Sequence, residues 1–235
     1  MRDIEPVRQV RYERPQGATE LVLVRHGESA PAIEGESFQL VDGHGDPALA
    51  PEGVEQAERV GERLAAEGGI DAVYVTTLRR THETAAPLLR FLGNAAPPVA
   101  VEADLREVHL GEWEGGIFRK KVISRDPIAV RMMTEERWDV IPGAEPADDF
   151  AARVKKAIQR LASAHPDQRV AVFTHGGVIG RILSEASGAR PFAFNNADNA
   201  SISHVVVSGD WWAVRRFNDT AHLHSGFTVR SAPLT

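Results

Sequence analysis

Two short apolar runs in this chain each end in a histidine. Residues 21–24 are followed by Arg25 and His26, and residues 170–174 are followed by His175. Continuous apolar runs of this length are typical of strands that are buried on both faces in a parallel sheet. In open α/β sheets, ligands bind at the carboxyl ends of such strands. If the two strands are neighbours, the two imidazoles face one another at a ligand site.

The segments between these runs alternate between helical and strand periodicity. Pro51 is typical of a first helical turn, and Asp148 is a predicted N-cap of a later helix. Apolar residues at helical spacing follow each start: Val54, Ala57, Val60 and Leu64 in the first helix, and Phe150, Val154, Ile158 and Leu161 in the second. The pattern also predicts a strand at 70–75, a helix at 81–91 and a hairpin at 203–217. This alternation predicts an α/β fold with a mostly parallel central sheet.

The length and composition predict one domain. A chain of 235 residues with 43% hydrophobic content can bury a single large core, which we place in residues 20–235. Residues 1–19 are polar, carry four arginines and are predicted as an N-terminal extension. Residues 30–50 show no regular spacing of apolar residues and are predicted as a long loop over the end of the first strand. Residues 112–147 are predicted as a cap-like insertion beside the site.

The charge and the missing cysteines exclude several classes of protein. The 27 Lys and Arg residues against 33 Asp and Glu residues leave a net charge of −6, so no global basic field is available for nucleic acid or an anionic membrane. The chain has no cysteine, which excludes disulfides, thiolate nucleophiles and Cys-ligated zinc. We see no apolar leader and no run of membrane-spanning length, so a cytoplasmic location is expected.

The residues around the two histidines suit a phosphate group. Phosphate carries close to two negative charges near neutral pH, so its pocket needs several charge-assisted donors. Arg25 supplies one guanidinium donor group beside His26. Arg80, which follows the predicted strand at 70–75, is the second candidate donor. Gly176, directly after His175, leaves room for the backbone to approach a small ligand. A local anion site is therefore predicted at these strand ends.

Taken in order, these motifs resemble the histidine phosphatase superfamily, in its phosphoglycerate-mutase-like branch. The resemblance extends from about Leu21 to Phe217. Residues 25–28 match the family's first-histidine motif, 46–49 its loop motif and 78–85 its second-arginine motif. Residues 105–107 with 111–115 match the proton-donor motif, and 174–177 match the second-histidine motif. The resemblance implies a three-layer α/β sandwich with a mostly parallel sheet flanked by helices.

The resemblance also implies a role for each matched residue. His26 would be the nucleophile that forms a phosphohistidine, and Glu107 the proton donor. Arg25, Arg80 and His175 would hold the phosphoryl oxygens, with Gly176 in the same binding site. His26 must then be neutral, whereas His175 is more useful protonated. The donors are protein cations, so we expect no metal and no cofactor, and a small phosphorylated substrate.

The chain departs from the family's pattern in two places. Residues 30–33 replace a loop asparagine whose amide contacts phosphate in many relatives, and we expect Ser37 or a backbone amide to substitute for it. The basic run 119–121 either binds a second anionic group of the substrate or lies on the solvated surface. Surface placement is the commoner meaning of such a basic run. The characteristic arginine pair of the cofactor-dependent mutases is not found.

Several nearby residues are interpreted as structural. Glu112 and Glu114 compete with Glu107 for the proton-donor role, and we assign them to loop capping and the surface. Asn199 is expected to be structural and His82 to lie on the surface. The four tryptophans are expected to pack: Trp113, Trp138, Trp211 and Trp212.

Three functions stay open at this point. The favoured one is a metal-independent phosphatase. The alternatives are a phosphoglycerate mutase-type phosphotransferase, which would need a pocket that excludes water, and a non-catalytic phosphate-binding regulator. The hairpin at 203–217 is compatible with a homodimer. The identity of the substrate is not encoded in any motif.

Overall fold

A six-stranded sheet forms the centre of the molecule. The computed structural model describes residues 9–224, so residues 1–8 of the predicted extension lie outside the described residues. The strand order is β5-β4-β6-β1-β7-β8. The strands are β1 (Thr19–Arg25), β4 (Ala72–Val75), β5 (Val99–Val101), β6 (Arg169–Thr174), β7 (Ile202–Ser208) and β8 (Trp211–Asp219). The first four run parallel, and β7 and β8 form an antiparallel hairpin at one edge, as predicted.

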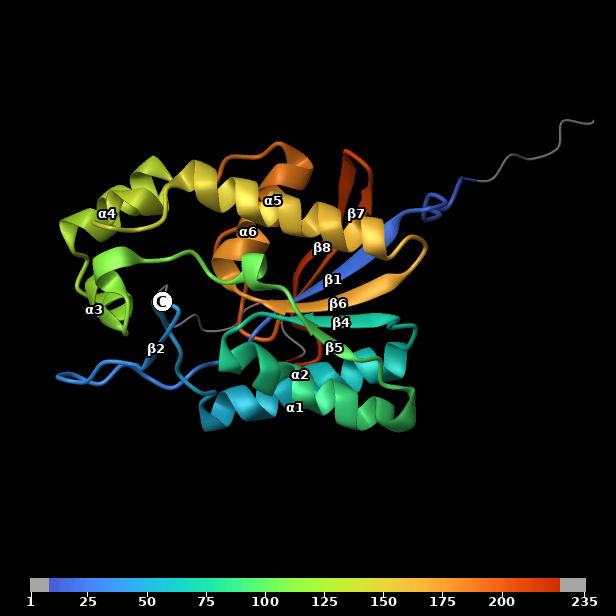
Figure 1. Ribbon diagram of the computed structural model, residues 1–235, viewed down its shortest axis with the longest axis horizontal. Coiled ribbons are helices and arrows are strands. Elements are labelled where there is room, and N and C mark those ends of the chain that lie inside the picture. The colour runs from blue at the N-terminus through green and yellow to red at the C-terminus, as the bar shows by residue number, and fades with distance from the viewer. Residues whose placement is uncertain (1–8, 225–235) are drawn as a thin grey trace, which may run out of the picture.

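Helices cover both faces of the sheet (Figure 1). The longer ones are α1 (Pro51–Glu67), α2 (Arg79–Leu92), α5 (Ala147–Ala164) and α6 (Gly176–Ser187). One core cluster joins the sheet to α5 and α6, and a second joins the opposite face to α1 and α2. The predicted three-layer α/β class with a mostly parallel sheet is confirmed. None of the helices within residues 9–224 is long and apolar enough to cross a membrane.

The segment between β5 and α5 forms a separate group of short helices at one end of the molecule (Figure 1). After η2 (Ala103–Leu105), whose Leu105 belongs to the core shared with α5 and α6, the group consists of η3 (Gly111–Trp113), α3 (Ile117–Ile123), α4 (Pro127–Glu135) and η4 (Trp138–Val140). These helices have a small core of their own, to which Trp113, Met132 and Ile141 belong. Across from them, the loop after β1 contains a two-stranded ribbon of β2 (Leu40–Val41) and β3 (His44–Gly45).

Some predicted details were wrong. Pro146, not Asp148, caps α5, because the helix begins at Ala147 and places Asp148 in the first turn, where its charge favours the helix dipole. Val54 lies at the spacing of the buried residues of α1 but is 50% exposed, since the inward position is taken by Gly53. Strand β4 begins at Ala72, two residues later than predicted.

The start of α1 packs on the backbone that follows β1. A Cβ at Gly53 would lie 1.9 Å from the carbonyl oxygen of Glu28, and a Cβ at Gly27 would lie 2.4 Å from the carbonyl oxygen of Gly53. The backbone amide of Ala50 also donates to the Glu28 carbonyl at 2.9 Å. The chain therefore needs glycine at both positions to bring this turn and the helix together.

Replacing Gly53 with alanine should destabilise the protein. In an ordinary helix this change stabilises by up to about 1 kcal/mol. Here the added methyl collides with backbone, and we expect a loss of about 2 kcal/mol or more in the free energy of unfolding. Urea denaturation measures this loss, with the exposed Glu55→Ala in the same helix as the control. A Gly53→Ala protein as stable as the wild type would contradict the close packing.

Candidate active site

A cavity of about 430 Å³ opens at the carboxyl end of the parallel strands. Of the residues predicted for the site, it is lined by Arg25, His26, Arg80, Glu107 and Gly176. Arg25 ends β1, Arg80 lies in the first turn of α2 after β4, and Gly176 begins α6 after β6. Residues more than 150 positions apart in the sequence thus meet because their strands are neighbours in one sheet.

His26 and His175 lie beside each other, as predicted. Their strands pair in parallel, with Arg25 opposite Thr174, and the His26 amide donates to the Thr174 carbonyl at 3.0 Å. The ring centroids are 5.2 Å apart, with the planes at 62°. His26 lines the cavity, whereas His175 is fully buried beside it with the two rings in an edge arrangement.

A hydrogen bond sets the tautomer of His26. Its Nδ1 lies 2.7 Å from the carbonyl oxygen of Gly27, which can only accept, so Nδ1 carries the proton. The other ring nitrogen, Nε2, then has a free lone pair. The Asn199 side-chain amide donates to the His26 carbonyl at 3.0 Å, which agrees with the expected structural role, and Asn199 also lines the cavity.

Both histidines are held neutral. Burial lowers the pKa of His26 well below its ordinary value, and the positive charges of Arg80 and Arg25 lower it further. Burial likewise lowers the pKa of His175 well below its ordinary value, with Arg80 and His26 adding to the effect. The lowered pKa of His175 disfavours the protonated form that was expected for it from the sequence.

Two buried arginines supply the positive charge. Arg80 is 7% exposed, and its Nη1 donates to the Gly45 carbonyl at 2.9 Å and lies 3.9 Å from the Asp46 carboxylate. Burial lowers the pKa of Arg80 to about 10, which still leaves it cationic at neutral pH. Arg25 donates through Nη1 to the Ala197 carbonyl, and burial lowers its pKa as well.

Two buried nitrogens of this group have no hydrogen-bond partner within the described residues. They are Nε of Arg25 and Nδ1 of His175. A buried polar atom without a partner costs about 1–3 kcal/mol, and such atoms are rare in proteins. An oxyanion can accept from Nε of Arg25, and it can accept from Nδ1 of His175 when that nitrogen carries the ring proton and Nε2 accepts from the Thr76 hydroxyl at 3.0 Å, so both residues suit an anionic ligand.

Glu107 reaches the same cavity from the loop after β5. Its Oε2 accepts from the Gly177 amide at 3.1 Å, and its Oε1 accepts from the Val108 amide at 3.0 Å. A Cβ at Gly177 would lie 2.5 Å from Oε1 of Glu107, so the carboxylate occupies space that only glycine leaves open. Glu107 is thereby fixed at the start of α6, beside the His26 turn.

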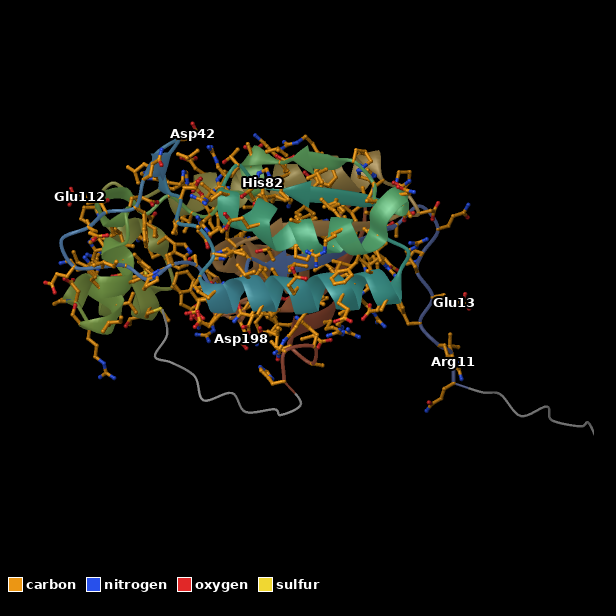
Figure 2. The ribbon with its side chains drawn as sticks, turned by 90° about the horizontal axis from the view of Figure 1, so that it is seen from below. Arg11, Glu13, Asp42, His82, Glu112 and Asp198 are labelled. Atoms are coloured by element: carbon orange, nitrogen blue, oxygen red, sulfur yellow. The ribbon has the colours of Figure 1, made fainter. Side chains whose placement is uncertain are left out.

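The two competing acids are placed differently. Glu112 is exposed on the outer end of the molecule (Figure 2). Glu114 lines the cavity, but both of its oxygens accept from backbone amides, of Leu110 at 2.9 Å and of Gly45 at 2.8 Å. Glu112 therefore lies on the surface, as expected, and Glu114 caps loop amides while also lining the cavity.

Arg153 holds the segment that carries Glu107, and sequence reasoning missed it. Its guanidinium is bidentate to Glu145, at 2.6 and 2.8 Å. Its remaining donors reach the carbonyls of Asp104, Arg106 and Glu107 at 2.6, 2.8 and 2.9 Å. All five donors are used, so the backbone on either side of Glu107 is attached to α5. Nothing in the helical stripe distinguishes Arg153 from a surface arginine.

Arg119 contacts the loop in which the family's asparagine is missing. It donates to the Ala30 carbonyl at 2.7 Å and to the Ser29 hydroxyl at 2.6 Å, and it lines the cavity. The charge of Arg119 contributes to the lowered pKa values of His26 and Arg25. Ser37, the expected substitute, is exposed and is not among the described residues that line the cavity. The surface interpretation was therefore wrong for Arg119.

The remaining predicted positions vary. His82 is exposed, as expected (Figure 2). Trp113 is buried among the short helices, but Trp211 is 48% exposed, so packing was the wrong expectation for it. Within residues 9–224, no group of three or more His, Cys, Asp or Glu side chains is arranged to hold a metal ion.

Comparisons with known proteins point to one family. The chain is 37% identical over 214 residues to phosphoglycerate mutase-like protein 4 of Arabidopsis thaliana, with 88% of this chain and 89% of that protein covered. It is 33% identical over 218 residues to a metal-independent phosphoserine phosphatase of the same plant, with 90% and 87% covered. The solved structure of a mycobacterial glucosyl-3-phosphoglycerate phosphatase has a TM-score of 0.69 at 26% identity, covering 86% of this chain and 100% of that one.

The family itself is recognised over nearly the whole chain. The sequence profile of the histidine phosphatase superfamily (branch 1) matches residues 21–220. This span includes every strand of the central sheet from Leu21 onward and all the cavity residues described above. The chain therefore belongs to the histidine phosphatase superfamily, branch 1.

Proposed function

We propose that this protein is a phosphatase that hydrolyses a phosphomonoester through a phosphohistidine on His26. The observation that carries the proposal is the Nε2 lone pair of His26 inside a cavity that also exposes Arg25, Arg80 and Glu107. A neutral, oriented imidazole among fixed cations is the arrangement needed to attack a phosphorus atom that carries negative oxygens.

The first step transfers the phosphoryl group to the protein. Nε2 of His26 attacks phosphorus, a P–N bond forms, and the bond to the leaving oxygen breaks. Protonated Glu107 gives its proton to that oxygen, and a neutral alcohol leaves. Arg25, Arg80 and the Nδ1 side of His175 face the phosphoryl oxygens and offset the charge that spreads over them.

The second step regenerates the enzyme. Water attacks phosphorus, its proton passes to the carboxylate of Glu107, and the P–N bond breaks to release phosphate and neutral His26. Both steps use only protein groups. We further propose that residues 112–147 act as a cap that closes the leaving-group side of the cavity, and that the substrate is a small phosphorylated molecule.

Replacing His26 should remove the activity. With an aryl phosphate as substrate and a chelator present, His26→Ala should lower kcat by about four orders of magnitude or more, since the nucleophile is lost. His165→Ala, before β6 at the opposite end of that strand from the site, is the matched control. Radiolabelled substrate quenched in alkali should leave label on the wild type and none on His26→Ala.

Two results would contradict this proposal. A folded wild-type protein that hydrolyses no phosphomonoester would exclude a phosphatase, and isomerisation of phosphoglycerate in its place would identify a mutase. Turnover that the chelator abolishes would show that the proposed metal-independent route is incomplete.

His26 should remain neutral into the acid range. The ordinary pKa of histidine is about 6.5, and burial with two neighbouring arginines lowers that of His26. As pH falls from 8 through 6.5, the imidazole should therefore stay unprotonated, and it should take up a proton only at more acid pH. NMR titration of the imidazole resonance that disappears in His26→Ala measures this. A midpoint at or above 6.5 would be evidence against the proposed state.

Arg119 should contribute to phosphate binding. Arg119→Met should lower kcat/KM by about 100-fold, because a positive charge that lines the cavity is lost. Arg119→Lys should restore only part of this, since an ammonium group cannot reproduce the planar fork that contacts Ser29 and Ala30. The exposed Arg125→Met is the control for net charge. Equal losses in Arg119→Met and Arg125→Met would show a nonspecific charge effect.

A further inference from the structure

The cavity has two chemically different sides. The strand ends contribute its charged side, around His26. The loop after β1 and the short helices contribute an apolar side, lined by Phe38, Phe118, Val122, Ile123, Met133 and Trp138. We call these six residues the apolar wall. Because they belong to the same cavity as His26, a substrate with its phosphate at the histidine extends toward them.

Aromatic rings make up much of the apolar wall. Phe118 lies 6.0 Å from Trp138 between ring centroids, and Trp113 lies 6.3 Å from Phe118 on the other side. Trp138 also packs against Phe192 at 4.9 Å. Rings at these distances support one another, so Phe118 and Trp138 are held in place, whereas the ring of Phe38 lies against the Arg119 guanidinium, 5.4 Å from its centroid.

The wall also presents apolar side chains to solvent. Ile123 is 62% exposed and Met133 is 41% exposed, on α3 and α4 respectively. Exposed apolar residues are common singly, but these two line one cavity together with partly exposed aromatic rings. Contiguous apolar surface of this kind, inside a cavity, is typical of a ligand-binding site.

Arg119, Lys120 and Glu114, the charged residues that line the cavity from or beside these helices, all make hydrogen bonds within the protein, whereas Glu28 lines the cavity from the loop after β1. Lys120 donates to the Ile33 carbonyl at 2.8 Å, and Glu114 accepts from two backbone amides. A substrate such as phosphoserine carries an ammonium and a carboxylate that both need partners. The apolar wall offers neither, so burying such a group there would cost free energy.

We propose that the leaving group of the natural substrate is a bulky apolar alcohol, aliphatic or aromatic, that binds against the apolar wall. This inference rests on the proposed function, since it assumes that phosphate lies at His26. It narrows the substrate class to phosphomonoesters of hydrophobic alcohols. The cavity of about 430 Å³ is within the range of about 300–1,000 Å³ that is usual for ligand sites, so it has room for such a group beyond the phosphate.

The test is a series of n-alkyl monophosphates from ethyl to hexyl, compared through kcat/KM. Their leaving oxygens have similar basicity, so the trend reports contact with the wall. Each buried methylene contributes about 0.8 kcal/mol when fully removed from water, which is about fourfold. Allowing for partial burial, we expect hexyl phosphate to exceed ethyl phosphate by about 30-fold, and to exceed phosphoserine.

Three substitutions, one of them a control, test whether the chain-length dependence arises from contact with the apolar wall. Ile123→Ser and Met133→Ser should each lower the hexyl-to-ethyl ratio by about fivefold. Val130→Ser is the matched control, because Val130 is 52% exposed on the same helix as Met133 but is not among the described residues that line the cavity. A wild-type ratio near one, a preference for phosphoserine, or an equal fall in Val130→Ser would overturn the inference.

A binding measurement separates this inference from the proposed function. Calorimetry with ethylphosphonate and hexylphosphonate, using the His26→Ala protein, needs no turnover. Hydrolysis of all esters with a flat chain-length dependence would support the phosphatase and overturn the apolar site. If hexylphosphonate binds His26→Ala more tightly than ethylphosphonate while the wild-type protein hydrolyses none of the esters, the apolar site is supported and the phosphatase is refuted.

Discussion

The parallel pairing of β1 with β6 is the interaction on which the site depends. It places Arg25 opposite Thr174, so the residues that follow, His26 and His175, leave the sheet side by side. A shift of one residue in this register would turn every side chain of β1 to the other face and separate the two rings. Both strands are buried in the apolar core, which makes such a shift costly. The position of the catalytic candidates is therefore a consequence of the packing of the core.

Burial of the cations has a second consequence for the chemistry. Arg25, Arg80 and both histidines share a small volume away from water, where like charges repel strongly. The histidines respond by staying neutral, while the arginines, with much higher intrinsic pKa values, remain charged. The same electrostatic environment that makes the site receptive to an anion thus leaves His26 unprotonated and able to act as a nucleophile.

Sequence reasoning placed residues correctly where they follow closely on a strand end. His26, His175 and Arg80 were located because each lies within a few residues of a buried run, and the order of elements follows from periodicity alone. It failed where a residue acts across the fold. Arg119 looked like part of a surface basic run, and its direction into the cavity depends on how α3 packs. Arg153 reaches Glu107 only because α5 packs beside the loop after β5. No local sequence pattern predicts that packing.

The side chains that line the cavity differ greatly in how much they contribute to the stability of the fold. Residues of the charged side are attached to the sheet, and changes there disturb the core or leave buried polar groups unpaired. Ile123 and Met133, on short helices at one end of the molecule, are largely exposed and contribute little to folding. Over evolutionary time, substitutions at such positions meet weak selection for stability, so relatives that share one chemical mechanism can diverge in what they accept as substrate while the reacting groups stay unchanged.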